Sequence, residues 1–363
     1  MRGGREHRTG RIRELDGWRA IAASIVLISH FLGHQHTRTI SRYPLFASIM
    51  FYMGYLGVQI FFVISGFVIC RLLLQEESRY GTFSLKAFYI RRVCRILPPF
   101  YLFLAAVLLL GRLGMVEVTG GQLAKAGLFF SDFHSLSSLW MTGHCWSLAV
   151  EEQFYLFFPA ILLLTPRRRR SVVCGAICVV CIASVLSISL TGWSALISPG
   201  VMEGFVCISC GVLMGIHESR VRAVARKAPF VLVFLAAVML LLHPFGNLND
   251  WKAASYQAIA VPPAIALLLL SSMERQSWFQ SLLCSRPVQA IGLTSYALYL
   301  WQQLFMGRRD VYFGTGRFIP LFLPLLCIIV SLSWFLIEKP AIDLGKKLSR
   351  RVRQTPETLN AVV

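Results

Sequence analysis

The chain has 363 residues, of which 56% are hydrophobic and 15% are charged. Soluble domains carry about 25% charged residues, so the composition excludes an ordinary soluble domain and predicts a chain that lies mostly in lipid, where charge is costly. The net charge of +19 does not indicate nucleic-acid binding, because Lys and Arg collect in the cytoplasmic loops of membrane proteins and no zinc-finger or RNA-binding motif accompanies them.

A membrane-spanning helix needs about 20 mostly apolar residues. On this criterion we predict an all-α integral membrane protein, a bundle of about ten transmembrane helices, in one domain over residues 18–337. A basic N-terminal tail, residues 1–17, and a basic C-terminal tail, residues 338–363, flank it. The predicted spans are 18–36, 53–74, 98–117, 146–165, 171–190, 200–217, 229–246, 255–272, 288–306 and 318–337.

The distribution of Lys and Arg predicts the orientation. With a cytoplasmic N-terminus, the inside segments hold 27 of these residues and the outside loops hold eight. This excess predicts that both termini are cytoplasmic in a multi-pass protein of the cytoplasmic (inner) membrane. The first span starts with Asp16 and Arg19 and is interrupted by His30, so we expect a signal anchor and not a cleaved signal peptide.

Two cysteine pairs, Cys178/Cys181 and Cys207/Cys210, have the C-x-x-C spacing found in metal and redox sites. Both pairs lie within predicted spans, where a free cysteine behaves as a small hydrophobic residue and small residues let helices approach closely. We therefore expect neither a metal site nor a disulfide framework.

The first span contains two ionisable residues, and such residues within spans are candidate functional groups because their burial is costly. Arg19 and His30 are eleven residues apart, which places them on one helix face about 16 Å from each other. Arg19 lies near the cytoplasmic edge. The alternative to a functional role is that its side chain only snorkels to the interface beside Asp16. His30 lies past the midplane, and a neutral imidazole suits a general base that deprotonates a hydroxyl.

The fourth span carries Ser147, Glu151 and Tyr155 at positions that share one helix face. Helical rise places Glu151 roughly 8 Å and His30 about 12 Å below the outer boundary. We therefore predict that the Glu151 carboxylate contacts and orients the His30 imidazole, as in a catalytic dyad. The alternative is a structural ion pair or hydrogen bond between the helices.

A cluster of arginines precedes Pro98 at the predicted cytoplasmic foot of the third span. Arg92 and Arg95 are neighbours on a helix, and guanidinium groups bind phosphates in a bidentate manner. The pair is thus a candidate docking point for a phosphorylated cytoplasmic donor. The alternative is charge that only fixes the orientation of the chain.

Together these stretches resemble the acyltransferase 3 family of membrane acyltransferases. The first span resembles its L-D-G-x-R-x-I-A-A element, with Arg19 and His30 at the R-x10-H spacing. Residues 54–67 resemble its G-x-x-G-V-x-x-F-F-V-x-S-G-F element. Trp18 stands where the family usually has Leu.

Two further elements extend the resemblance over the whole chain. Arg92 and Arg95 stand at the R-x-x-R pair, and the stretch from Trp146 to Tyr155 resembles W-S-L-x-V-E-x-Q-F-Y. From this element we expect Trp146, Ser147 and Tyr155 to contact substrate.

The resemblance implies ten spans, an acyl-CoA donor (commonly acetyl-CoA) on the cytoplasmic side, and transfer to a hydroxyl of a carbohydrate or another exported molecule. It also implies that Arg19 and His30 are essential and that the arginine pair contacts the donor. Some members carry an additional esterase-like domain after the spans. Because only residues 338–363 follow here, we expect the stand-alone form.

We therefore predict O-acylation in which His30, oriented by Glu151, removes the proton of the acceptor hydroxyl. Arg92 and Arg95 hold the phosphates of the donor, and Arg19 serves either those phosphates or the developing oxyanion. The alternative is a transporter or flippase for a polysaccharide precursor, with His30 and Glu151 as a proton relay. Many transporters contain inverted repeats, and the sequence shows no internal repeat.

Overall fold

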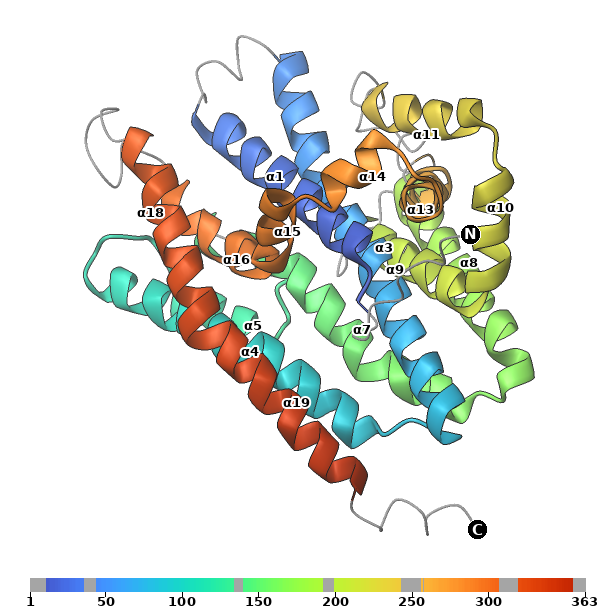
Figure 1. The fold of residues 1–363 in the computed structure, drawn as a ribbon. Helices are drawn as coiled ribbons and strands as arrows, with labels where there is room; N and C mark the ends of the chain where they lie inside the picture. Colours follow the sequence, from blue (N-terminus) through green and yellow to red (C-terminus); the bar gives the residue numbers. More distant parts are fainter. Residues whose placement is uncertain are drawn as a thin grey trace.

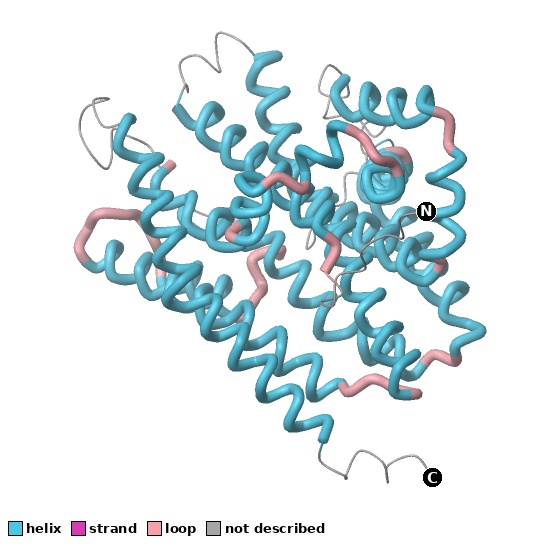
Figure 2. The backbone as a smooth tube through the Cα atoms, viewed as in Figure 1, coloured by secondary structure: helices cyan, strands magenta, loops and turns pink. Residues whose placement is uncertain are grey.

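The computed structural model describes residues 11–35, 44–133, 140–191, 199–242, 256, 258–306 and 319–354. Helices joined by loops and turns make up these residues, and the part of the chain that is described contains no strand (Figures 1 and 2). The prediction of an all-α protein is confirmed.

The helices follow one another with short connections. In chain order they are α1 (Arg13–Gln35), α3 (Pro44–Tyr80), α4 (Leu85–Arg112), α5 (Gly120–Gly127), α6 (Trp140–Gly143), α7 (Cys145–Leu164), the 3-10 helix η1 (Arg167–Arg169), α8 (Arg170–Thr191), α9 (Pro199–Ile216), α10 (Glu218–Lys227), α11 (Phe230–Leu242), α13 (Val261–Glu274), α14 (Trp278–Leu283), α15 (Arg286–Leu293), α16 (Ser295–Phe305), α18 (Ile319–Leu332), the π-helix η4 (Ser333–Glu338) and α19 (Lys339–Gln354).

Several of these helices can cross a membrane. Among the described residues, six are long and apolar enough, and α9 with α10, bent by 93° at their junction, would make a seventh. Two shorter apolar helices, Phe230–Leu241 and Val261–Glu274, coincide with predicted spans. The chain is thus a multi-pass membrane protein. The count of ten spans and the side of the membrane on which the termini lie stay predictions.

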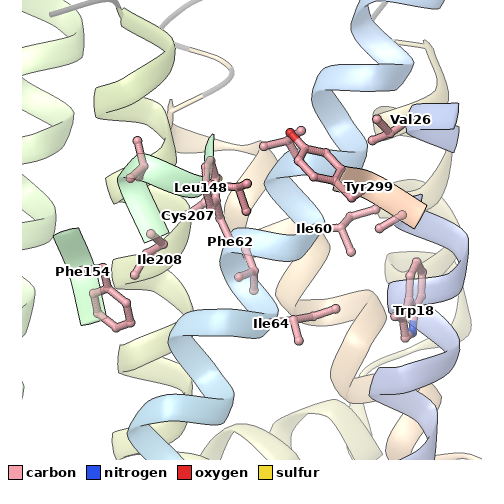
Figure 3. Packing of buried hydrophobic residues seen from close by; sticks show 14 of the residues in the cluster. Trp18, Val26, Ile60, Phe62, Ile64, Leu148, Phe154, Cys207, Ile208 and Tyr299 are labelled. Atoms are coloured by element: carbon pink, nitrogen blue, oxygen red, sulfur yellow. The ribbon is translucent and has the colours of Figure 1, made fainter. Parts of the chain in front are cut away.

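Helix α3 is the centre of the bundle, with 78% of its most apolar window buried. It packs closely on α9, and two glycines make this approach possible. A Cβ atom at Gly66 would collide with the Ile208 carbonyl oxygen, and one at Gly211 would collide with the Val63 carbonyl oxygen. Glycines at such crossings let two backbones approach. Figure 3 shows buried side chains of α1, α3, α7, α9 and α16 meeting in one core.

Two ends of predicted spans differ from the structure. The third span was expected to start at Pro98, but α4 starts at Leu85, where Ser84 caps the helix by accepting a hydrogen bond from the Ala87 amide at 3.2 Å, and it continues through Pro98 and Pro99. Residues 339–354 of the predicted C-terminal tail form α19, which packs along α4 (Figure 1). The described part of the basic tail is therefore an element of the bundle.

Candidate active site

A small cavity of about 80 Å³ lies where α1, α3, α4, α7 and α16 meet. We call it the arginine pocket, because Arg19 of α1 and Arg92 and Arg95 of α4 all line it. Figure 3 shows three of its apolar and aromatic lining residues: Phe62, Leu148 and Tyr299. The charged and hydroxyl-bearing lining residues are Arg19, Ser65, Arg92, Arg95, Ser147, Glu151, Glu152, Tyr155, Ser295, Tyr296 and Tyr299.

Different contacts hold two of the three arginines of the pocket, Arg19 and Arg92. The Arg19 guanidinium donates to Asp16, one turn earlier on α1, at 3.3 Å. The Arg92 guanidinium lies 5.2 Å from the centre of the Tyr155 ring, a cation–π arrangement that holds the charge in place without neutralising it. The pocket therefore presents a concentration of positive charge.

The acidic side of the pocket comes from α7. Glu151 accepts hydrogen bonds from the Ser65 hydroxyl at 2.6 Å and from the Tyr155 hydroxyl at 3.3 Å. The Tyr155 hydroxyl is also within 3.2 Å of Ser65, and the neighbouring Glu152 lines the same pocket. Ser65 and Glu152 were not among the predicted site residues. A hydroxyl within the apolar run of α3 is the sequence signal that could have identified Ser65.

Two further hydroxyl groups, those of Ser147 and Tyr299, line the pocket. They are hydrogen-bonded to each other at 2.6 Å, and both lie within reach of the His144 carbonyl oxygen, at 3.1 and 3.2 Å. Because each hydroxyl has one proton, one donates to the other and the second donates to the carbonyl. The buried His144 ring packs against Tyr299 and interacts electrostatically with His30.

The predicted contact between Glu151 and His30 is wrong. Glu151 is bound to Ser65 and Tyr155, at the level of Arg19, whereas the His30 ring lies 5.5 Å from the Trp140 ring, about 16 Å further along α1. The depth of Glu151 was counted from a span that starts at Trp146. In the structure the span starts at Trp140, so Glu151 lies about 9 Å deeper than was predicted.

Arg92 and Arg95 lie in the first half of α4, which spans Leu85–Arg112, and line a pocket that also holds carboxylates. Their place at the cytoplasmic foot of the span stays a prediction. Trp146 is not among the described residues that line the pocket. Its ring packs against those of Tyr55 and Phe62, at 6.2 and 6.0 Å.

The described residues contain no group of three or more His, Cys, Asp or Glu side chains placed to hold a metal ion. All ten cysteines, including both C-x-x-C pairs, are free thiols. The ligand-binding potential of the described site therefore rests on arginines, carboxylates and hydroxyls.

Comparison with known proteins gives the chain its family. The family model described as an acyltransferase domain matches residues 12–338. Among similar proteins are "Putative O-acetyltransferase SAR0937" of Staphylococcus aureus (strain MRSA252), 28% identical over 96% of this chain and 60% of the relative, and "Putative peptidoglycan O-acetyltransferase YrhL" of Bacillus subtilis (strain 168), 27% identical over 82% of this chain and 52% of the relative.

A third relative is the O-acetyltransferase OatA of Staphylococcus aureus (strain NCTC 8325 / PS 47), 26% identical over 92% of this chain and 57% of the relative. The chain spans only about half to 60% of the length of these curated relatives. No solved structure matches it. With nearly all of its length matched by the family model, the chain belongs to the acyltransferase 3 family of membrane proteins.

Proposed function

We propose that this protein is an acyl-CoA-dependent O-acyltransferase that moves a small acyl group, most simply acetyl, onto a hydroxyl of a cell-envelope carbohydrate. The observation that carries the proposal is the arginine pocket, in which three guanidinium groups meet Glu151 and Tyr155 in about 80 Å³. A cavity needs about 10–15 Å³ in this measure to hold one water molecule, and sites for drug-sized ligands enclose about 300–1,000 Å³. The pocket thus has room for a small acyl group and is too small for a nucleotide.

The pocket suits the charge that develops during acyl transfer. When the hydroxyl oxygen attacks the thioester carbonyl, negative charge gathers on the carbonyl oxygen, and positioned cationic donors stabilise it. Arg92 and Arg95 of α4 line the pocket and supply such donors. Arg19, about 16 Å from His30 along α1, serves to hold the donor. The new C–O bond replaces the C–S bond, the thiolate of coenzyme A leaves, and the hydroxyl proton passes to a base.

We propose His30 as that base, acting on an acceptor that approaches from the outer end of α1. Side chains on a helix tilt toward its N-terminus, so the His30 ring leans toward the level of the pocket. Ser147 and Tyr299 line the pocket and contact His144, which interacts electrostatically with His30. In this arrangement the donor enters from the arginine side and the acceptor from the histidine side.

The acceptor class and the location belong to the same proposal. The name of the Bacillus subtilis relative refers to peptidoglycan, which supports an envelope carbohydrate. We propose ten spans in the cytoplasmic membrane with both termini inside, supported by the 27-to-eight distribution of Lys and Arg. Accessibility labelling should place residues 166–170 inside and residues 243–254 outside, and an outside C-terminus would contradict the model.

The activity is tested with purified protein in lipid nanodiscs and radiolabelled acetyl-CoA. We expect saturable binding of acetyl-CoA and, with envelope glycan added, label on the glycan and free coenzyme A in equal amounts. A transporter or flippase would show neither. Glycan analysis of host cells with and without the gene then identifies the acceptor.

A further inference from the structure

A second and much larger cavity, about 1650 Å³, opens at the end of the bundle that carries the predicted cytoplasmic segments. We call it the basic cavity. The ends of α1, α3, α9 and α19 and the first turns of α4 and α10 contribute to its wall. Nine of the lining residues are Arg or Lys, and three are Glu, so its formal charge is strongly positive.

Ion pairs within the cavity neutralise only part of this charge. Glu76 is shared by Arg91, at 3.1 Å, and Arg353. Glu218 is shared in the same way by two other arginines of the wall, Arg71 and Arg222, at 3.0 and 2.8 Å. Arg222 also binds Glu274, at 2.7 Å, so the cation left uncompensated by these carboxylates is one of the two at Glu76.

Two exposed arginines of the wall have no such partner. Within the part of the chain that the structure describes, neither Arg79 at the end of α3 nor Arg350 of α19 forms an ion pair. Tyr80, a residue that is 59% exposed and whose ring centre lies 5.8 Å from the Arg353 guanidinium, lines the same wall. Free guanidinium groups and an exposed aromatic ring are the groups that bind phosphates and stack on bases.

The basic cavity and the arginine pocket are neighbours along three helices. On α3, Arg71 lines the basic cavity and Ser65 the pocket, about 9 Å apart along the axis. On α4, the adjacent Arg91 and Arg92 line one cavity each. At the start of α1, Asp16 accepts hydrogen bonds from Arg11, which lines the basic cavity, and from Arg19, which lines the pocket.

We propose that the basic cavity binds the 3′-phosphorylated ADP moiety of the acyl-CoA donor, with Arg79 and Arg350 as phosphate ligands. The inference rests on the proposed function, and it moves the phosphate site from Arg92 and Arg95 to a different set of residues. Binding sites for ligands of this kind usually enclose about 300–1,000 Å³. The volume of the basic cavity exceeds this range, and the volume of the arginine pocket lies far below it. The pantetheine arm then extends along α3 toward the pocket.

Calorimetry on the full chain in zwitterionic nanodiscs tests this assignment, with coenzyme A, 3′,5′-ADP and pantetheine as probes. Wild type should bind coenzyme A and 3′,5′-ADP, and pantetheine far more weakly. The double variant Arg79→Gln/Arg350→Gln should bind both nucleotides at least about tenfold more weakly, because each arginine supplies charge-assisted hydrogen bonds. The same change at Arg168, which is exposed on the same predicted side but outside the cavity, should leave the affinities unchanged.

The outcomes separate the two proposals. If wild type binds and consumes acetyl-CoA while the double variant retains wild-type affinity for coenzyme A and 3′,5′-ADP, the nucleotide assignment is overturned and the proposed function stands. If wild type binds neither coenzyme A nor acetyl-CoA, the proposed function fails and the assignment fails with it.

A lipid headgroup offers the same phosphate chemistry, and a second arm distinguishes it. Native mass spectrometry from nanodiscs that contain phosphatidylglycerol counts the retained anionic lipids. If Arg79→Gln/Arg350→Gln removes a bound phosphatidylglycerol but does not change the affinity for coenzyme A, the cavity is a lipid site and the inference is overturned. Competition of coenzyme A with that lipid, lost in the double variant, supports it.

Discussion

The two ends of α1 differ in the chemistry that surrounds them. At the N-terminal end, Arg19 pairs with Asp16 and shares a pocket with Arg92 and Glu151. At the C-terminal end, His30 lies against the Trp140 ring and near another imidazole. One end is thus rich in fixed charges, and the other holds aromatic rings and groups that transfer protons.

The two ends therefore differ from a catalytic dyad, in which a carboxylate and an imidazole act side by side. In a dyad, a carboxylate orients the imidazole and stabilises its charged form. Here the carboxylate of Glu151 is engaged with hydroxyl groups at the arginine end. We infer that the arginine end of α1 holds the donor and that the histidine end removes the proton of the acceptor, so that substitutions at its two ends should have distinct kinetic effects.

The largest effect is expected at the histidine end. His30→Ala should lower acyl transfer by about 10²- to 10⁴-fold, the usual contribution of a general base, while binding of acetyl-CoA remains. Turnover and calorimetry on the same preparation measure both. His217, whose ring is hydrogen-bonded to Ser171 at 2.7 Å, is a matched control, and His217→Ala should keep both. Wild-type turnover in a folded His30→Ala protein would remove the assignment of the base.

The next effect is expected at the arginine end. Arg92→Ala should lower kcat by about 10²- to 10³-fold, as does removal of an oxyanion donor. Lys at this position should restore only part of the rate, because an ammonium group cannot reproduce the planar fork. Arg112→Ala at the far end of the same helix is the control. If Arg92→Ala changes only the affinity for coenzyme A and leaves kcat intact, Arg92 is a phosphate ligand as the sequence had suggested.

These contrasts show what the sequence could predict. Charged residues inside apolar helices are easily recognised, so Arg19, Arg92, Arg95 and Glu151 could be selected, and the structure brings them together in one pocket. Their partners could not be predicted, because contacts between helices depend on where each span starts. The six-residue difference between Trp140 and Trp146 as the start of one span moved Glu151 away from the level of His30.

A similar reason applies to the basic end of the bundle. A high content of Lys and Arg in cytoplasmic segments is expected in any membrane protein, so composition does not distinguish a binding cavity from orientation charge. Only folding shows that α19 turns its basic residues toward the end of α3. The distinction between Arg79 or Arg350 and an orientation residue such as Arg168 is therefore a tertiary property.

Glu151→Gln should have a smaller effect than His30→Ala and Arg92→Ala. We expect kcat to fall about tenfold, since the variant weakens charge-assisted hydrogen bonds of about 1.5–3 kcal/mol. Because Glu151 is bound to Ser65 and Tyr155, the variant should keep the wild-type midpoint of the pH–rate profile. A midpoint displaced to lower pH in Glu151→Gln would show that the carboxylate does act on the catalytic base.

The smallest effect is expected from Ser65→Ala. The Ser65 hydroxyl donates to Glu151 at 2.6 Å, and its loss leaves the carboxylate with the Tyr155 hydroxyl at 3.3 Å. One hydrogen bond contributes about 0.5–1.5 kcal/mol net, so kcat should fall about two- to tenfold, with the affinity for acetyl-CoA unchanged. Ser184→Ala, which removes a hydroxyl that donates only to its own helix, should leave kcat as in wild type.

Combining the two pocket substitutions tests whether Ser65 acts through Glu151. If it does, Ser65→Ala in a Glu151→Gln background should cost less than it does in wild type, because residues in one hydrogen-bond network are not additive. Full additivity of the two losses would mean that the hydroxyl contacts substrate directly. In that case the arginine end would contain a second polar group that acts independently of the carboxylate. The two ends of α1 would then differ mainly in where their groups lie, and less in the charge of those groups.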